Sequence, residues 1–391
     1  MIPLIKYTML NEKNVKKELS NFLIRAKKLS MGKLCEEFEY KFAKFQDRKY
    51  AILFNSGSSA NLALIQALKN LNFLKNNDNV GFSALTWATN VMPIIQLGLK
   101  PIPIDIEIET MNISDETILK RLKDINIKAL FITNVLGFTG NLSEIKKLCD
   151  KKNIILLEDN CEALGTELYN GKSGNFGLAS TFSFYVAHHM STIEGGMVCT
   201  DYDDLAVMLK MVRAHGWDRN LDDSDKEFYR NKYKVKDNFY GNYTFYDLGY
   251  NLRPTEITGF IGLKQLDVIN RSNRRRLEIY REIYEVYERN NDFIKHSSKH
   301  IKFLSPFAFP VICKTKELRE KYLNKFNKNK IETRPLIAGN ITRQPFFVKY
   351  IKKKYNLQNA DFIHKNAFYF GIYPEMNKKE ISLIKNTLIK N

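Results

Sequence analysis

Residues 50–70 read YAILFNSGSSANLALIQALKN, and this stretch decides the fold. The apolar run 50–54 is typical of a buried strand, and residues 60–70 have the apolar spacing of a helix. Between them, residues 55–61 (NSGSSAN) are small and polar. The sequence therefore predicts a strand, a tight turn and a helix in immediate succession.

The same alternation continues along the chain. We expect further strands at residues 79–82, 101–105, 129–133, 154–158, 181–184 and 196–200, with helices at 90–97, 114–122, 143–151 and 203–214. Strands that alternate with helices form βαβ units and a mostly parallel sheet covered by helices on both faces. The predicted fold class is α/β.

The length predicts two domains, because 391 residues exceed the roughly 250–300 at which one hydrophobic core stops growing. We expect a large α/β domain over residues 1–262 and a smaller α+β domain over 263–391, and the N-terminal segment is a candidate to join the smaller one. A helix is expected to start near Pro254 and run through Leu266, and the long charged helix that follows, over 270–290, is expected to bridge to the smaller domain.

The chain is basic, with 61 Lys and Arg against 43 Asp and Glu and a net charge of +18. Such a charge is compatible with nucleic acid, a membrane surface or an anionic substrate as partner. The densest clusters, 274–276 (RRR) and 352–354 (KKK), are interpreted as solvated helix faces. No base-stacking aromatics interleave with them, so a nucleic-acid partner is not predicted.

No stretch approaches the roughly 20 apolar residues that span a bilayer, and the N-terminus lacks a signal-peptide pattern. We therefore expect a cytoplasmic protein without a membrane partner. The chain has five widely spread cysteines, Cys35, Cys149, Cys161, Cys199 and Cys313. No two of them form a CxxC pair, so neither a disulfide framework nor a metal or iron–sulfur site is predicted.

Three features favour a flat, phosphorylated ligand. The turn 55–61 opens a helix, whose free N–H groups and positive end attract phosphate, although small turns of this kind are common. Asp159 ends a strand where open α/β sheets bind ligands, and its carboxylate suits the ring nitrogen of pyridoxal phosphate. Its alternative role is to cap the next helix. Trp87 follows another strand and is either a stacking platform or a core residue.

Residues 180–196 (STFSFYVAHHMSTIEGG) carry a resemblance to a known family. They resemble the run S-F-[HY]-x-x-K-x-x-x-x-x-E-G-G of the DegT/StrS-type sugar aminotransferases, which are fold-type I pyridoxal-phosphate enzymes with an aspartate aminotransferase-like fold. The lysine position of that run falls on His188. No lysine occurs in the stretch, so the cofactor cannot be tethered covalently there.

A histidine at this position resembles the branch of the family that contains 3-dehydratases of nucleotide-linked 4-keto-6-deoxy sugars. Residues 213–220 (RAHGWDRN), 249–254 (GYNLRP) and 333–340 (TRPLIAGN) resemble its GDP-sugar members. A sister CDP-sugar enzyme carries an iron–sulfur cluster on clustered cysteines. No cysteine lies between Cys199 and Cys313 here, which favours the cluster-free GDP-sugar branch.

The resemblance implies a role for each site residue. The cofactor-binding set comprises Gly57, Ser58 and Ser183 at the phosphate, Asn251 reaching it from a second subunit, Asp159 at the ring nitrogen, Trp87 on the ring face and Glu162 at its edge. His215, Arg219 and Arg334 are candidates for the sugar and its diphosphate. For both arginines, pairing on the surface is the alternative.

The implied activity is C3 dehydration of a GDP-linked 4-keto-6-deoxy hexose or heptose for surface-polysaccharide biosynthesis. His188 acts as the base, pyridoxamine phosphate supplies the amine, L-glutamate restores it, and a homodimer shares its active sites. His189 is expected to point the other way if the stretch is extended. The rival enzyme is a nucleotide-sugar aminotransferase with a displaced lysine. A rival of another class is a non-catalytic sugar-sensing or nucleic-acid-binding relative.

Overall fold

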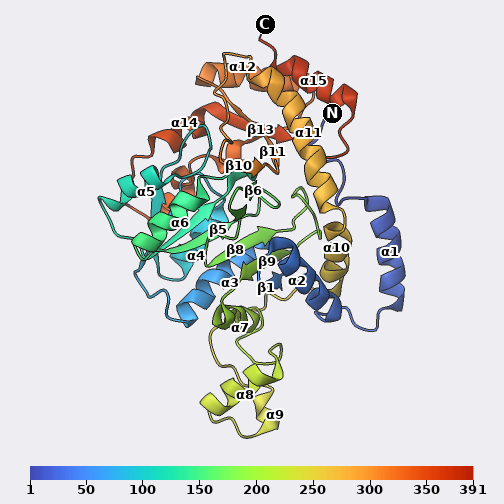
Figure 1. The fold of residues 1–391 in the computed structure, drawn as a ribbon, viewed down its shortest axis with the longest axis vertical. Helices are drawn as coiled ribbons and strands as arrows, with labels where there is room; N and C mark the ends of the chain where they lie inside the picture. Colours follow the sequence, from blue (N-terminus) through green and yellow to red (C-terminus); the bar gives the residue numbers. More distant parts are fainter. Residues whose placement is uncertain (391) are drawn as a thin grey trace.

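A seven-stranded sheet forms the centre of the molecule, in a computed structural model that describes residues 1–390 (Figure 1). The strand order is β1-β9-β8-β5-β4-β2-β3. The strands are β1 (Tyr50–Phe54), β2 (Asn79–Ser83), β3 (Lys100–Ile104), β4 (Ala129–Thr133), β5 (Ile155–Asp159), β8 (Ala179–Ser183) and β9 (Gly196–Thr200). Only β9 runs antiparallel to its neighbours, β1 and β8, among these seven strands. The predicted mostly parallel sheet is confirmed, and each predicted strand lies within two residues of the observed one.

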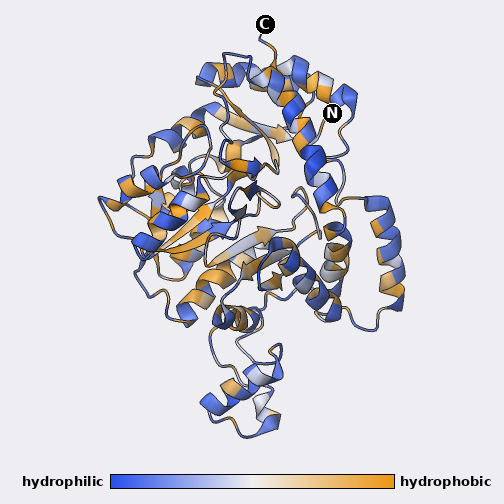
Figure 2. Ribbon diagram, viewed as in Figure 1, coloured by the Kyte–Doolittle hydropathy of each residue, from blue (hydrophilic) through white to orange (hydrophobic). Residues whose placement is uncertain are grey.

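Helices cover both faces of this sheet, as predicted. They are α2 (Lys33–Gln46), α3 (Gly57–Asn70), α4 (Ala88–Gln96), α5 (Asp115–Leu122), α6 (Leu142–Lys151) and α7 (Asp203–Val212). Strand β4 shows how the faces separate: Leu130 and Ile132 pack into one hydrophobic cluster, and Ala129 and Phe131 into another. This alternation follows from the two-residue period of a strand. Figure 2 accordingly shows a largely hydrophobic central sheet, surrounded by helices that carry many hydrophilic residues.

The C-terminal part of the chain contains a second sheet, which is antiparallel and has the strand order β11-β13-β12. Its elements are α10 (Glu256–Leu266), α11 (Ile269–Tyr287), β11 (Ala308–Ile312), α12 (Lys316–Lys328), β12 (Thr333–Pro335), α13 (Pro345–Tyr350), α14 (Gln358–Asn366), β13 (Ala367–Gly371) and α15 (Lys378–Leu388). The N-terminal Ile2 forms a parallel bridge to Ile331, so the N-terminus contacts this part. The domain boundary between residues 262 and 263 stays a prediction.

Further elements flank these two sheets. They are α1 (Glu12–Arg25), which packs on α10, the small sheet of β6 (Glu167–Leu168), β7 (Gly171–Lys172) and β10 (Ile301–Phe303), and helices α8 (Asp223–Lys232) and α9 (Asn238–Gly241). Helices α8 and α9 project from the body beyond α7 (Figure 1). We call residues 218–250, which contain them, the arm. None of the helices in residues 1–390 is both long and apolar enough to cross a membrane.

The basic clusters differ from the expected solvated helix faces. Arg274 is exposed and Arg275 pairs with Glu278, but Arg276 is buried, so the interpretation is wrong for that residue. Successive residues of a helix point about 100° apart, which is why one member of an RRR run faces the core. Residues 352–354 are exposed as expected but lie in an irregular segment rather than on a helix.

Candidate active site

The expected cofactor-binding residues come from loops at one edge of the central sheet. Trp87 follows β2, Asp159 ends β5, Ser183 ends β8, and Gly57 begins the helix after β1. These four strands point the same way, so their carboxyl ends meet at one edge, where open α/β sheets bind ligands.

Gly57 and Ser183 lie against each other at the start of α3. A Cβ placed on Gly57 would lie 2.6 Å from Ser183 Cβ, so only glycine permits this approach. Ser56 caps the helix, its Oγ accepting from Ser59 N at 3.1 Å, while Ser58 is exposed. The first N–H groups of a helix have no partner within it and attract anions. The result is a cradle of suitable chemistry for a phosphate.

Asp159 is buried and held by three donors. Asn61 Nδ2 and Asn90 Nδ2 donate to its Oδ2 at 3.0 and 2.7 Å, and the Cys161 N–H donates to Oδ1 at 2.8 Å. The chain continues from β5 into turns and the short strand β6, so the alternative that Asp159 caps a following helix is wrong. Its carboxylate is instead fixed in orientation at the end of the strand.

Sequence reasoning missed Asn61 and Asn90, which hold this carboxylate. Both are almost completely buried, on α3 and α4 respectively. A signal was present: each asparagine occupies a core-facing position of a helix, and buried amides require partners. The sequence alone does not show that these two asparagines contact Asp159, because the three residues meet only when their separate segments are folded together.

Trp87 stands at the N-cap of α4 and is 56% exposed. The alternative of a core tryptophan is therefore wrong. An exposed indole at this edge of the sheet offers a flat apolar face on which a ring can stack.

Glu162 lies in the turn that follows Asp159. Its Oε2 accepts from Leu136 N at 2.9 Å, and burial raises the pKa of its carboxyl to about 8 despite that bond. Glu162 is therefore mostly protonated at neutral pH and can donate a hydrogen bond. Burial also raises the pKa of Tyr369; the charge of Glu162 raises it further, whereas that of Arg334 lowers it. Both residues thus lie within electrostatic reach of Tyr369.

His188 lies in the loop between β8 and β9. This loop is bent rather than extended, with Ala187 at a left-handed φ of 85°, and is closed by a hydrogen bond from Phe184 N to the Gly195 carbonyl at 2.9 Å. The Nδ1 atom of His188 is buried without a partner, although the residue as a whole is partly exposed. Its ring packs edge-on against Phe307, with ring centroids 5.2 Å apart.

The pKa of His188 is lowered to about 4, chiefly by burial; the Tyr185 carbonyl acts against this effect, and the positive charge of Arg276 makes a smaller contribution in the same direction as burial. The imidazole is therefore neutral at pH 7 and able to accept a proton.

The adjacent His189 has a different environment. The expectation that its side chain opposes that of His188 assumed an extended chain, and both rings in fact contact Phe307. His189 is completely buried, and its Nε2 lies 3.0 Å from the Ser305 carbonyl oxygen. That hydrogen bond satisfies one ring nitrogen of His189 in the core.

Two of the expected substrate residues gather around Trp217. The Arg219 guanidinium lies between the rings of Trp217 and Tyr243, 4.3 and 4.2 Å from their centroids, and the His215 ring meets the edge of Trp217. Arg219 and Asn251, both exposed, also line a cleft of about 400 Å³ beside Trp217. A guanidinium and an aromatic ring on a cleft wall suit a phosphate and a base.

Arg334 lies apart from that cluster, on β12. Its side chain is 55% exposed and its Nη2 donates to Glu332 Oε1 at 2.7 Å. This is the surface pairing named as the alternative. Arg334 nevertheless stands opposite Tyr369 in the pairing of β12 with β13, and the charges of both Arg334 and Glu162 influence the pKa of Tyr369.

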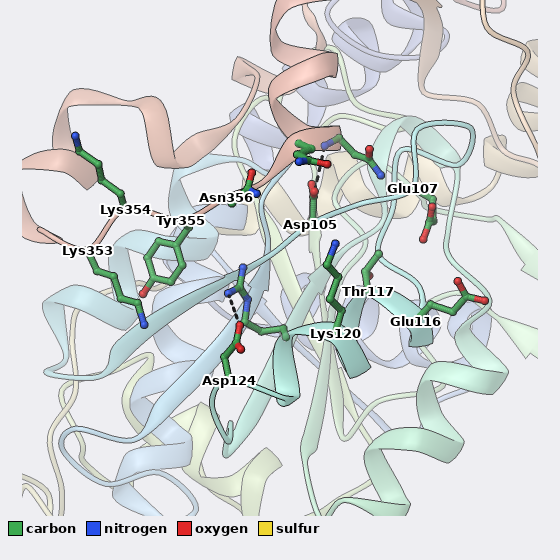
Figure 3. Close-up of a pocket in the computed structure, with 13 residues that line it drawn as sticks. Asp105, Glu107, Glu116, Thr117, Lys120, Asp124, Lys353, Lys354, Tyr355 and Asn356 are labelled. Carbon is green, nitrogen blue, oxygen red and sulfur yellow. Dashed lines mark hydrogen bonds and ion pairs between the residues drawn. The ribbon is translucent and has the colours of Figure 1, made fainter.

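A larger cleft, of about 670 Å³, lies between α5 and the segment before α14 (Figure 3). Lys353 and Lys354 stand on one side of it, and Glu107 and Glu116 on the other. None of the expected site residues lines it. Within residues 1–390, no group of three or more His, Cys, Asp and Glu side chains is arranged to hold a metal ion.

Comparison with known proteins agrees with this geometry. Residues 11–388 match the model of the DegT/DnrJ/EryC1/StrS aminotransferase family. The chain belongs to this family. The predicted family and the aminotransferase-like fold are therefore confirmed.

Three similar proteins are informative. GDP-4-keto-6-deoxy-D-mannose 3-dehydratase of Escherichia coli O55:H7 is 33% identical over 94% of both chains. The lipopolysaccharide biosynthesis protein RfbH of Salmonella typhimurium is 34% identical over 91% of this chain and 84% of its own. A crystal structure of GDP-4-keto-6-deoxymannose-3-dehydratase with a trapped PLP-glutamate geminal diamine superposes with a TM-score of 0.90 at 31% identity, covering 99% of this chain and all of the other.

Proposed function

We propose that this protein is a dehydratase that removes the C3 hydroxyl of a GDP-linked 4-keto-6-deoxy sugar, a hexose or a heptose. The product is the corresponding 4-keto-3,6-dideoxy sugar. The observation that carries the proposal is the imidazole of His188 at the position where the family run has its lysine. The likeness to an enzyme named for this reaction over almost the whole chain supports it, as the Salmonella relative supports a role in surface-polysaccharide biosynthesis.

The residues present fit pyridoxal phosphate and its pyridoxamine form. A buried carboxylate with fixed orientation, Asp159, suits the pyridine nitrogen, and the exposed indole of Trp87 suits the ring face. The cradle that a Cβ on Gly57 would fill, with Ser58 and Ser183 beside it, suits the phosphate. Glu162, protonated near neutral pH, can donate at the ring edge.

When bound, this cofactor supplies an amine that condenses with the C4 ketone and a ring that accepts electrons. Asp159 keeps the ring nitrogen protonated, and the phosphate cradle holds the ring in place without a covalent bond. His188, neutral at pH 7, takes a proton from the C4′ methylene carbon. The imidazolium that results is a proton source for the departing C3 hydroxide, which leaves as water.

L-Glutamate is proposed to restore the amine form after each turnover. The support is the family membership and the glutamate named in the related crystal structure. His215, Arg219 and Arg334 are proposed to bind the sugar and its diphosphate, because two of them surround the Trp217 cleft and the third lies near Tyr369.

We further propose a homodimer in which Asn251 completes the active site of the partner. The arm supports this, because it exposes large apolar side chains that a monomer rarely leaves in water: Phe228, Phe239, Tyr240, Tyr243, Phe245 and Leu248, each at least 58% exposed. Asn251 itself is exposed beside the arm, where a second subunit can be reached.

Mixed dimers test this shared site. Subunits carrying His188→Asn and subunits carrying Asn251→Ala, coexpressed with different tags, would form a heterodimer with one fully native site. Purified heterodimers should recover about half of the native activity, whereas both homodimers stay impaired. Heterodimers as inactive as the homodimers would show that each site is built within one subunit.

A cytoplasmic location is proposed as well. All five cysteines are free in this structure and four are buried, which suits a reducing compartment. No nucleic-acid or membrane partner is proposed.

The test of the activity is mass spectrometry of products from a panel of GDP- and CDP-linked 4-keto-6-deoxy sugars, supplied with pyridoxamine phosphate and glutamate. We expect a product that has lost the C3 oxygen, together with released ammonia, from a GDP-linked sugar. A product that keeps its C3 hydroxyl and gains an amino group at C4 would instead identify an aminotransferase.

A further inference from the structure

Arg276 is a buried cation to which the reaction above assigns no role. It lies on α11 with 4% of its surface exposed, and its Nη1 donates to the carbonyls of Phe307, at 2.9 Å, and Ile372. No carboxylate of residues 1–390 forms an ion pair with it; burial lowers the pKa of its guanidinium, and the charge of Glu375 acts against that effect. A buried charge of this kind costs free energy, and an apolar residue of similar volume is often at least as stabilising. Its presence calls for another explanation.

Phe307 connects this cation to the proposed base. Its carbonyl accepts from Arg276, and its ring contacts the rings of His188 and His189 at centroid distances of 5.2 and 5.7 Å. The guanidinium therefore anchors the residue against which the imidazole of His188 rests.

Beside these groups lies a small, partly open pocket of about 30 Å³. Arg276, His188 and His189 all line it, and Arg276 Nε and the Nδ1 atoms of both histidines are buried without partners. This volume holds one or two waters, which cannot screen a neighbouring charge as bulk solvent does. The titratable and charged side chains facing His188 are those of Lys6 and Tyr7 from the N-terminal segment, Arg276 from α11, Tyr373 and Glu375 after β13, and Tyr185 and His189 from its own loop.

We propose that Arg276 is a positioning residue for His188: it fixes the imidazole through Phe307, and its positive charge adds to burial in favouring the neutral, proton-accepting form. A cation nearby disfavours a second cation, so the neutral ring is the stable state. The lowered pKa of His188 agrees, since the charge of Arg276 adds to the effect of burial. This inference rests on the proposed function for its catalytic meaning.

The direct test does not depend on activity. The protein has six histidines, so imidazole-¹⁵N labelling gives few NMR signals, and His188→Asn assigns that of His188. In Arg276→Met the charge is lost, and we expect the pKa of His188 to rise by at least half a unit. In Arg276→Lys the charge remains and the pKa should stay close to the native one. Arg274→Met removes the same charge from an exposed position of α11 and is the matched control.

Kinetics then separate charge from position. The acidic limb of the kcat/KM profile should move upward with the pKa in Arg276→Met but not in Arg276→Lys. Both variants should lose roughly 10–100-fold in kcat with KM nearly unchanged, because a displaced base reacts poorly. An unchanged pKa of His188 in folded Arg276→Met would overturn the electrostatic part, whatever reaction the enzyme catalyses.

A second variant covers the case in which Arg276→Met does not fold. Phe307→Leu keeps the cation but removes the ring that supports His188. We expect kcat to fall at least tenfold while His188 stays neutral at pH 5.5. Native kcat in this variant would overturn the positioning role.

Discussion

The cofactor cradle and the arm are built in opposite ways. In the cradle, Asp159 is buried with three donors and Gly57 touches Ser183, so the polar groups are fixed within one chain. In the arm, Arg219 and Tyr243 are exposed. The difference teaches that the chemistry common to the family is preorganised by the sheet. In our proposal, recognition of the sugar falls to surfaces that a substrate and a second subunit would complete.

The strongest test of this contrast is His188→Asn. Asparagine keeps a polar side chain but cannot take up a proton near neutral pH, so dehydration should fall by roughly 10²–10⁴-fold, the usual contribution of a positioned general base. Binding of cofactor and sugar should persist, because other residues carry it. Initial rates of product formation, with binding measured by calorimetry, check both parts.

His188→Lys is the complement to that variant. It restores an amine that can hold the cofactor covalently, and we expect most C3 elimination to be lost. Borohydride reduction and peptide mapping of this variant should then find the cofactor attached to residue 188. The same treatment of the unmodified protein should find no lysine of the site carrying the cofactor. Near-native dehydration by His188→Asn would mean that His188 is not the base.

Asp159→Asn tests the cofactor cradle, and we expect a smaller effect from it than from the substitutions of His188. The new amide would face the amides of Asn61 and Asn90 and could not hold the ring nitrogen protonated. A hydrogen bond to a charged group contributes about 1.5–3 kcal/mol, so affinity for pyridoxamine phosphate should fall about 10–100-fold. Fluorescence titration measures it, with the exposed Asp124→Asn as control.

In the arm, Arg219→Lys should weaken binding of the nucleotide sugar and leave binding of the cofactor unchanged. Lysine keeps the charge but not the planar group that lies between Trp217 and Tyr243. Since such contacts are worth about 0.5–2 kcal/mol, KM for the nucleotide sugar should rise about 2–30-fold with cofactor affinity unchanged. A loss of cofactor affinity would break the proposed division of labour.

The smallest effect concerns stability in acid. Burial holds the pKa of His189 well below its ordinary value in the folded protein, so the unfolded chain binds the proton more readily. Stability is therefore full above pH 6.5 and falls as the pH drops below that value. Lowering the pH from 7.5 to 5.5 should cost about 1.4 kcal/mol through this residue. Urea unfolding at both pH values measures the cost, and His189→Asn should reduce the pH dependence.

The sequence predicted most of this fold because its signals were local. Apolar runs such as residues 50–54 fixed the strands to within two residues, and the spacing before Glu194 identified His188. The bent loop around His188 was not foreseen, since no pattern marks a left-handed Ala187. The burial of Arg276 was missed for a related reason. Which residue of an RRR run faces the core depends on what packs against the helix.

The contact between Gly57 and Ser183 has a consequence for the making of the protein. The two residues are separated by 126 positions, and β1 also finds its partner only when β9 has been made. Ribosomes add roughly 5–20 residues per second, so synthesis from residue 57 to residue 183 takes about 6–25 s. During that interval YAILF is an unpaired apolar segment on the nascent chain. The proposed phosphate cradle is incomplete until nearly half of the chain has been translated, so we expect the cofactor to bind the assembled sheet rather than the nascent chain.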